Sequence, residues 1–317
     1  MKNKSEKIIV VLGPTSSGKS DLAVALALRL SSGQAQKKFG IRGAEIISAD
    51  SRQVYQGMNL GSGKITKKEM RGVPHYLLDV ASPKRRFTAA QYKKLAQATI
   101  KKIHRQNKLP IICGGTGFYI QALTDNLALP KVKPNLKLRA QLEKLSTPKL
   151  YQQLKKLDPR RAKNIDCFNR RRLIRALEII KTTGQPIPRL KNAPAKNILF
   201  LGIEIAPEIL ARRIKIRLEK RLKQGMLAEV KKLHAQGLSW KRLDGFGLEY
   251  RWLARYLQKK TLRQAQDKLS YQEMTARLQK DTEHYAKRQM TWFNRNGQIR
   301  WIKNERQAEN IVKKFLK

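Results

Sequence analysis

Residues 13–20 carry the clearest chemical signal in the chain. Their sequence, GPTSSGKS, fits the pattern G-x-x-x-x-G-K-[ST], and it lies between a β-branched run at residues 7–12 and a helical pattern at residues 19–30. In that context the glycines let backbone N–H groups turn toward a phosphate, and the helix N-terminus adds a favourable dipole. Lys19 is placed to reach the terminal phosphate oxygens, and the Ser20 hydroxyl to coordinate Mg²⁺.

The motif predicts a site for a di- or triphosphate, with Ser20 as the metal ligand and Mg²⁺ as the cofactor. A kinase, an NTPase and a transferase that releases diphosphate all remain open at this point. The expected diphosphate-binding residues are Gly13, Pro14, Thr15, Ser16, Ser17, Gly18, Lys19 and Ser20.

Two further polar segments follow buried strand patterns. Asp50 comes directly after the apolar residues 44–48, and the glycine-rich sequence GGTG at residues 114–117 follows the apolar residues 109–113. Ligands of parallel α/β sheets bind beyond the carboxyl ends of the strands, so we expect these segments to share a site with the phosphate loop. The spacing leaves open whether Asp50 is a general base, a metal ligand or a helix cap.

The elements that must position these residues alternate between strand and helix patterns. This alternation predicts an α/β fold with a parallel sheet flanked by helices. We expect residues 1–130 to form the first part of this core and residues 131–195 to form a basic helical insertion. Residues 196–317 then return to the sheet, with a strand near residues 197–205, C-terminal helices and a short last strand at residues 299–302.

The charge balance points to an anionic partner. The formal net charge is +46, while hydrophobic residues, at 41%, are numerous enough to build a core. Residues 131–195 carry a net charge of +14, about as much as the much longer flanks, which carry +15 and +17. RNA, DNA, an anionic membrane surface and a general compositional bias all fit this charge.

The composition also excludes some classes of protein. No apolar run reaches the roughly 18 residues of a spanning helix, so we expect no membrane insertion. Two cysteines cannot build a disulfide framework or a four-cysteine zinc site. We therefore expect a cytoplasmic protein, and a monomer as the default.

Several motifs, taken in order, resemble the tRNA dimethylallyltransferase (tRNA isopentenyltransferase) family in its bacterial form. They are GPTSSGKS, ISADSRQVYQGM, PHYLLDV, GGTGFYIQAL, NRRRLIRALEI with TGQP, and YAKRQMTWF. The resemblance implies a P-loop NTPase-like core. It also implies transfer of a dimethylallyl group from dimethylallyl diphosphate to N6 of adenosine 37 in the tRNA anticodon stem-loop, with release of diphosphate.

The resemblance also implies residue roles. Asp50 matches the aspartate that engages N6, Thr15 a threonine that contacts the diphosphate, and Arg242 an arginine that binds the leaving diphosphate. Two extra residues between Gly247 and Tyr250 depart from the family pattern, so Arg251 competes with Arg242 for that role. The implied tRNA-binding residues are Asp50, Ser51, Arg52, Gln53, Thr116, Arg139, Asn169, Arg170, Arg171, Arg172 and Leu173.

Three alternatives stand beside this function. A P-loop small-molecule kinase would bind ATP and ignore tRNA, leaving the basic insertion without a purpose. A free-adenylate isopentenyltransferase would not need that insertion either. A non-catalytic RNA-binding protein would retain its binding when Asp50 is replaced.

Overall fold

The computed structural model describes residues 6–130, 132–188, 197–261 and 269–317. The chain divides into two compact units, a larger one formed by Met1–Asp125 with Pro194–Lys317 and a smaller one formed by Asn126–Ala193. Residues 131 and 195, the limits of the insertion expected from the sequence, lie outside the described ranges.

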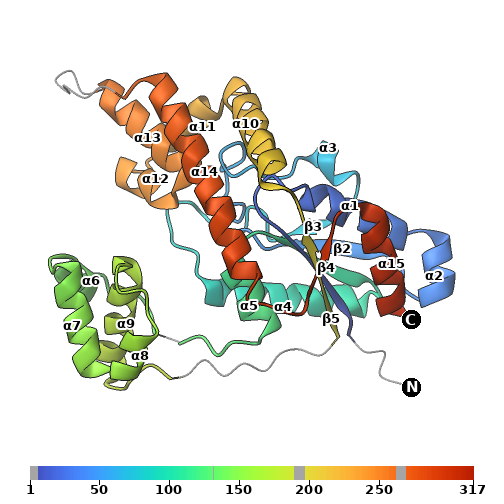
Figure 1. Ribbon diagram of the computed structural model, residues 1–317, viewed down its shortest axis with the longest axis horizontal. Coiled ribbons are helices and arrows are strands. Elements are labelled where there is room, and N and C mark those ends of the chain that lie inside the picture. The colour runs from blue at the N-terminus through green and yellow to red at the C-terminus, as the bar shows by residue number, and fades with distance from the viewer. Residues whose placement is uncertain (1–5, 131, 189–196, 262–268) are drawn as a thin grey trace. The chain divides into compact units, whose positions relative to one another are not determined.

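The larger unit is built on a six-stranded parallel sheet with the order β3-β2-β4-β1-β5-β6 (Figure 1). The parallel α/β fold expected from the sequence is therefore confirmed, including the return of the chain to the sheet after the insertion. The strands are β1 (Ile8–Leu12), β2 (Ala44–Ser48), β3 (His75–Tyr76), β4 (Leu109–Gly114), β5 (Ile198–Ile203) and β6 (Ile299–Ile302).

Both faces of the sheet are covered because successive side chains of a strand point to opposite sides. Val10 and Leu12 of β1 pack with α4 (Ala89–Arg105) and α5 (Gly117–Thr124). Ile9 and Val11 pack on the other face with α1 (Lys19–Leu30) and α15 (Glu305–Leu316). The strand is thus apolar at every position, as a doubly covered strand must be.

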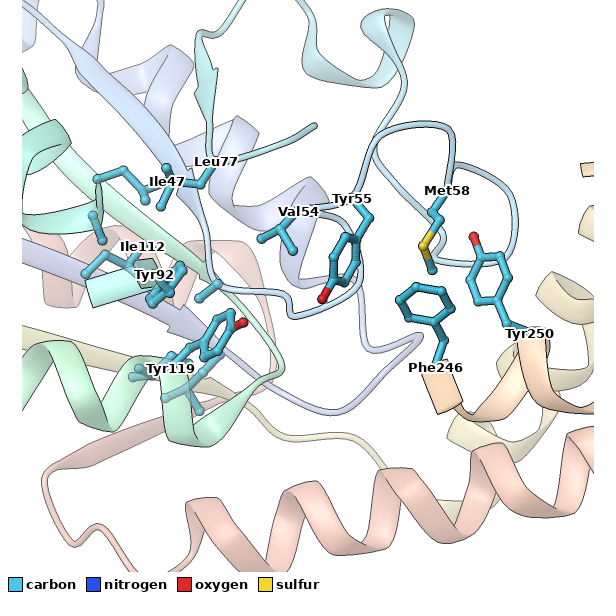
Figure 2. Close-up of a cluster of buried hydrophobic side chains, with 14 of the residues drawn as sticks. Ile47, Val54, Tyr55, Met58, Leu77, Tyr92, Ile112, Tyr119, Phe246 and Tyr250 are labelled. Atoms are coloured by element: carbon cyan, nitrogen blue, oxygen red, sulfur yellow. The ribbon is translucent and has the colours of Figure 1, made fainter. Parts of the chain in front are cut away.

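A second group of helices extends the larger unit beyond the sheet. Three aromatic rings join this group to the segment that follows β2. The ring centres of Tyr55, after β2, and Phe246, of α12, lie 5.1 Å apart, and those of Phe246 and Tyr250, of α13, lie 5.8 Å apart (Figure 2). The long helix α14 runs from this group back to α5 (Figure 1). The helices of this group are α10 (Pro207–Lys223), α11 (Met226–Ala235), α12 (Trp240–Phe246), α13 (Leu248–Thr261) and α14 (Tyr271–Phe293). Along the chain, α2 (Gly33–Phe39) precedes β2 and α3 (Lys67–Met70) precedes β3.

The smaller unit is entirely helical in its described residues. Its helices are α6 (Leu136–Glu143), α7 (Thr147–Leu157), α8 (Pro159–Lys163) and α9 (Arg170–Thr183). Leu150, Leu154, Leu173 and Leu177 form the centre of a separate hydrophobic core. In neither unit is a described helix both long and apolar enough to cross a membrane.

Candidate active site

The loop between β1 and α1 presents backbone donors at the carboxyl end of the sheet. Gly18 has a φ of 90°, which glycine adopts without steric cost, and α1 begins at the next residue. The Ser17 N–H donates to the carbonyl of Pro14 at 3.3 Å and closes the loop. The buried Ser17 hydroxyl has no partner within the described part of the chain. An unpaired buried hydroxyl beside a helix N-terminus suits a polar, anionic ligand.

Lys19 extends back over this loop. Its Nζ donates to the carbonyl of Pro14 at 3.1 Å. Burial lowers the pKa of Lys19; the neighbouring Arg217 guanidinium lowers it further, and the Asp50 carboxylate opposes both effects. Burial also raises the pKa of Cys113 to about 11, so this thiol is protonated at neutral pH.

Two arginines of α10, which sequence reasoning missed, bind loop carbonyls, and one of these carbonyls belongs to the phosphate loop. Arg213 Nη1 donates to the carbonyl of Ser17 at 3.4 Å, and Arg217 Nη2 donates to the carbonyl of Gly63 at 3.1 Å. Burial, followed by the neighbouring Arg221, lowers the pKa of Arg217. Their i,i+4 spacing was the available signal. Basic residues are so frequent in this chain that such a spacing could not single them out.

Asp50 lies where β2 ends, and its two carboxylate oxygens differ. Oδ1 accepts hydrogen bonds from the backbone N–H groups of Arg52 at 2.7 Å and Gln53 at 3.2 Å. Oδ2 has no donor among the residues that the structure describes. One oxygen therefore caps the following turn, which is not a helix, and a role for the other as a general base or a metal ligand stays a prediction. Burial, followed by the negative charge of Asp50, raises the pKa of Tyr285 on α14.

The turn after Asp50 is fixed to the loop after β4. The Ser51 N–H donates to the Thr116 hydroxyl at 3.0 Å, and the Thr116 N–H donates to the carbonyl of Ala49 at 3.1 Å. The strand order, with β2 beside β4 and β4 beside β1, brings Asp50, Thr116 and the phosphate loop to one edge. These three segments therefore lie at one edge of the sheet, as expected.

Arg52 and Gln53 bind other parts of the protein through their side chains. Arg52 Nε donates to the carbonyl of Phe246 at 2.6 Å. Gln53 Nε2 donates to the carbonyl of Gly63 at 3.1 Å, and its Oε1 accepts from the Ser48 hydroxyl at 3.3 Å. Both side chains hold surrounding loops in place.

Gln289 of α14 is a second residue that sequence reasoning missed. This buried amide accepts from the Thr15 N–H at 2.8 Å and donates to the carbonyl of Gly115 at 2.8 Å. One side chain thereby connects the phosphate loop to the loop after β4. Gly115 must be glycine because a Cβ there would lie 2.3 Å from Nε2 of Gln289. The signal was present in the motif YAKRQMTWF, but the sequence does not show where this glutamine points.

The two arginine candidates for the leaving diphosphate make their contacts elsewhere. Arg242 donates to the carbonyls of Pro83 at 2.8 Å and Arg85 at 2.7 Å, and its guanidinium lies 4.4 Å from the centre of the Phe246 ring. Arg251 pairs with Asp244 at 3.7 Å. Arg213, not these two, contacts the phosphate loop, because α10 rather than the start of α12 or α13 runs past it.

Arg139, which the sequence predicted to bind tRNA, forms an ion pair within the smaller unit. Its Nε and Nη2 bind the two carboxylate oxygens of Glu178 at 2.8 and 2.7 Å. Arg175 binds the same carboxylate, and the Asn135 N–H donates to it at 2.7 Å. Burial alone would raise the pKa of Glu178, but these hydrogen bonds outweigh it and lower the pKa. Arg139 therefore neutralises a fully buried acid.

The remaining tRNA candidates divide by exposure. Leu173 is completely buried in the core of the smaller unit, so its side chain cannot contact RNA and this expectation is corrected. The Asn169 side chain caps α9 by accepting from the Arg172 N–H at 3.2 Å, and Arg170 donates to the carbonyl of Glu143. Arg171 and the side chain of Arg172 are exposed.

The residues present fit a metal ion that is coordinated mainly by the phosphates of a bound substrate and by water. Among the described residues, no group of three or more histidine, cysteine, aspartate or glutamate side chains could hold a metal ion. Ser20 borders a small cavity at the start of α1 and supplies one hard oxygen. Mg²⁺ is commonly bound by one or two protein oxygens, substrate phosphates and water, and this site can meet that requirement. The other polar residues that line the cavity are Ser48, Gln53, His75 and Cys113.

Comparison with known proteins agrees with this arrangement. The IPP transferase family model matches residues 53–296. A tRNA dimethylallyltransferase of Pelotomaculum thermopropionicum is 38% identical over 314 residues, which are 97% of this chain and 94% of that protein. The counterpart in Limosilactobacillus reuteri is 37% identical over 98% of this chain and 97% of its own length.

Solved structures share the architecture over nearly the whole chain. The tRNA isopentenylpyrophosphate transferase of Bacillus halodurans is 32% identical, with a TM-score of 0.70 and coverage of 98% of this chain and 97% of that one. A eukaryotic dimethylallyltransferase acting on tRNA is 26% identical, with a TM-score of 0.74 and coverage of 94% and 74%. The family model matches most of the chain, the relatives match it over nearly their whole length, and the fold is shared. This chain therefore belongs to the IPP transferase family.

Proposed function

We propose that this protein transfers a dimethylallyl group from dimethylallyl diphosphate to N6 of adenosine 37 in tRNA, releasing diphosphate. One observation carries the proposal beyond family membership. Asp50 follows β2 and the phosphate loop follows β1, and the strand order brings both to one edge of the sheet. A group that can accept a proton thus lies beside a cluster that can hold a diphosphate, as an alkyl transfer between the two requires.

The donor side stabilises the charge that develops on the leaving diphosphate. Backbone N–H groups of the phosphate loop, Lys19, Arg213 and Arg217 supply positive potential at that position. We assign the Thr15 hydroxyl to the diphosphate oxygen nearest the reacting carbon. Ser20 would hold Mg²⁺, which when bound supplies further electrostatic stabilisation of the diphosphate.

The acceptor side engages the exocyclic amine of adenine. This nitrogen is a poor nucleophile because its lone pair is delocalised into the ring. The free Oδ2 of Asp50 would accept the N6 proton as the new N6–C1 bond forms, while the C1–O bond breaks and its electron pair leaves with the diphosphate. The bonds from Arg52 and Gln53 N–H groups to Oδ1 hold the carboxylate in orientation.

The tRNA substrate accounts for the basic smaller unit. Its exposed Arg171 and Arg172 are available for phosphates of the anticodon stem-loop. A small-molecule kinase or a free-adenylate isopentenyltransferase would leave these exposed cations unused, and the relatives are named as tRNA enzymes. A tRNA substrate is compatible with a cytoplasmic location, and a monomer stays the default expectation.

Incubation with labelled dimethylallyl diphosphate, Mg²⁺ and unmodified tRNA tests the proposal. We expect label in tRNA that carries adenosine 37 and none in the same tRNA with guanosine at that position. AMP and ATP, supplied separately, should remain unlabelled. Label in AMP but not in tRNA would favour the free-adenylate enzyme, and phosphate transfer from ATP would favour a kinase.

A further inference from the structure

Phe168 is the most exposed large hydrophobic side chain among the described residues. Its relative exposure is 89%, compared with 75% for Leu136, the next in order. Both belong to the smaller unit. A phenyl ring gains free energy when it leaves water, so a nearly complete exposure leaves that gain available to a partner.

The backbone around Phe168 holds this ring outward. The Phe168 N–H donates to Asp166 Oδ1 at 3.1 Å, and the Phe168 carbonyl accepts from the Arg170 N–H at 3.1 Å. Phe168 directly precedes Asn169, the N-cap of α9, a position from which an apolar side chain often packs on the first turn of the helix. Leu173, its partner in such a contact, is instead fully buried within the core.

Two exposed arginines, Arg171 and Arg172, follow Phe168 closely in the sequence. The exposed guanidinium groups of Arg171 and Arg172 have no hydrogen bond or ion pair with any residue in the described ranges. By contrast, Arg139 and Arg175 on the same unit are held by Glu178. Asp166 is the acid nearest in sequence, and its Oδ1 is already used by the backbone of Phe168.

We propose that Phe168 stacks on an unpaired base of the tRNA substrate while Arg171 and Arg172 bind the adjoining phosphates. An exposed aromatic ring followed in the chain by exposed guanidinium groups matches the two features of single-stranded RNA, a base with a π-face and a charged backbone. A protein partner would require a wider apolar surface than one ring among cations. The inference rests on the proposed function, since it identifies a contact for the same tRNA.

The test measures tRNA affinity of the full-length protein as a function of salt. Alanine substitution of residues that stack on bases weakens binding by about 5- to 150-fold, and we expect Phe168→Ala to lie near the lower end, at about 5- to 20-fold. Phe168→Trp should bind like the wild type, whereas Phe168→Leu should remain weak because it keeps apolar area without a π-face. Leu136→Ala, a matched exposed position in the same unit, should bind normally.

The salt dependence separates stacking from charge. Phe168→Ala should leave the slope of log affinity against log salt unchanged, whereas Arg172→Ala should reduce its magnitude by about one. All variants change exposed side chains, and unchanged thermal unfolding would verify that each is folded.

Three results would overturn the inference. Normal tRNA binding by Phe168→Ala, in a preparation whose wild type transfers the dimethylallyl group, would remove Phe168 while leaving the proposed function intact. Full tRNA binding by Phe168→Leu, with weak binding by Phe168→Ala, would show an apolar contact with tRNA that needs no aromatic face, and would refute stacking. A wild type that neither binds nor modifies tRNA would refute both.

Discussion

Replacement of Gln289 by glutamate would test whether one buried amide sets the geometry of the active site. The new side chain has the same size and keeps an oxygen that can accept from the Thr15 N–H, now 2.8 Å from Oε1. It removes the donor that reaches the Gly115 carbonyl at 2.8 Å and places a carboxylate oxygen against that carbonyl. The change therefore breaks the connection to the loop after β4 and spares the connection to the phosphate loop.

The expected loss of kcat follows from the burial of Gln289. The Gln289 side chain is 5% exposed, and a buried acceptor that loses its donor costs about 1–3 kcal/mol. If that cost appears in the transition state, where the loops of Thr15 and Thr116 must be correctly spaced, kcat falls about 5- to 150-fold. Burial also raises the pKa of the introduced carboxyl group. Below that pKa the carboxyl carries a proton, can donate to Gly115, and should restore much of the rate.

The assay is the initial rate of dimethylallyl transfer at saturating tRNA and dimethylallyl diphosphate, measured from pH 6 to pH 9. We expect Gln289→Glu to show a low kcat at alkaline pH that rises relative to wild type as the pH falls, with tRNA affinity little changed. Thr282→Val is the matched control, because Thr282 is an equally buried polar residue of α14 whose hydroxyl binds only the Leu278 carbonyl of its own helix. A wild-type kcat for Gln289→Glu at every pH, or an equal loss for Thr282→Val, would refute the reasoning.

Three further predictions concern the base, the diphosphate site and the smaller unit. Asp50→Asn keeps an oxygen for the turn but cannot accept the N6 proton, so kcat should fall by about 10²- to 10⁴-fold with tRNA affinity unchanged; an affinity loss at normal kcat would contradict this. Arg217→Ala should raise the KM for dimethylallyl diphosphate and not that for tRNA, as steady-state kinetics with each substrate varied would show; equal effects on both would argue against a diphosphate contact. Glu178→Ala should destabilise the smaller unit by about 3–5 kcal/mol in denaturant unfolding at pH 7. Because the pKa of Glu178 is lowered in the folded state, its contribution is present above the ordinary glutamate pKa of about 4.3 and is lost as the pH falls below that value, so the two proteins should converge there; a gap that persists in acid would contradict the ion-pair account.

Local patterns predicted the main elements of the fold because they report directly on backbone preference and burial. The apolar runs at β1, β2 and β4 are typical of strands covered on both faces, and the polar or glycine-rich loops that follow them predict the ligand edge. Even the short sequence IRWI was identifiable as the last strand, β6.

Side-chain partners could not be predicted in the same way. Arg139 and Arg172 have the same residue type in the same basic segment, yet one is paired with a fully buried glutamate and the other is exposed. Arg242 followed the family pattern, but its guanidinium is used by the carbonyls of Pro83 and Arg85. A guanidinium can bind phosphate, carboxylate or carbonyl oxygens, so its neighbours in space decide its role.

The sequence by itself determined the α/β class, the position of the phosphate loop and the edge of the sheet where chemistry takes place, because each depends on residues that are adjacent in the chain. Only the tertiary structure decided which distant residues complete that edge. Gln289 and Arg213 lie far along the chain from the phosphate loop that they contact, and α14 and α10 bring them to it. The physical reason is that hydrogen bonds and ion pairs depend on distances of a few ångströms in space, which separation along a sequence does not encode.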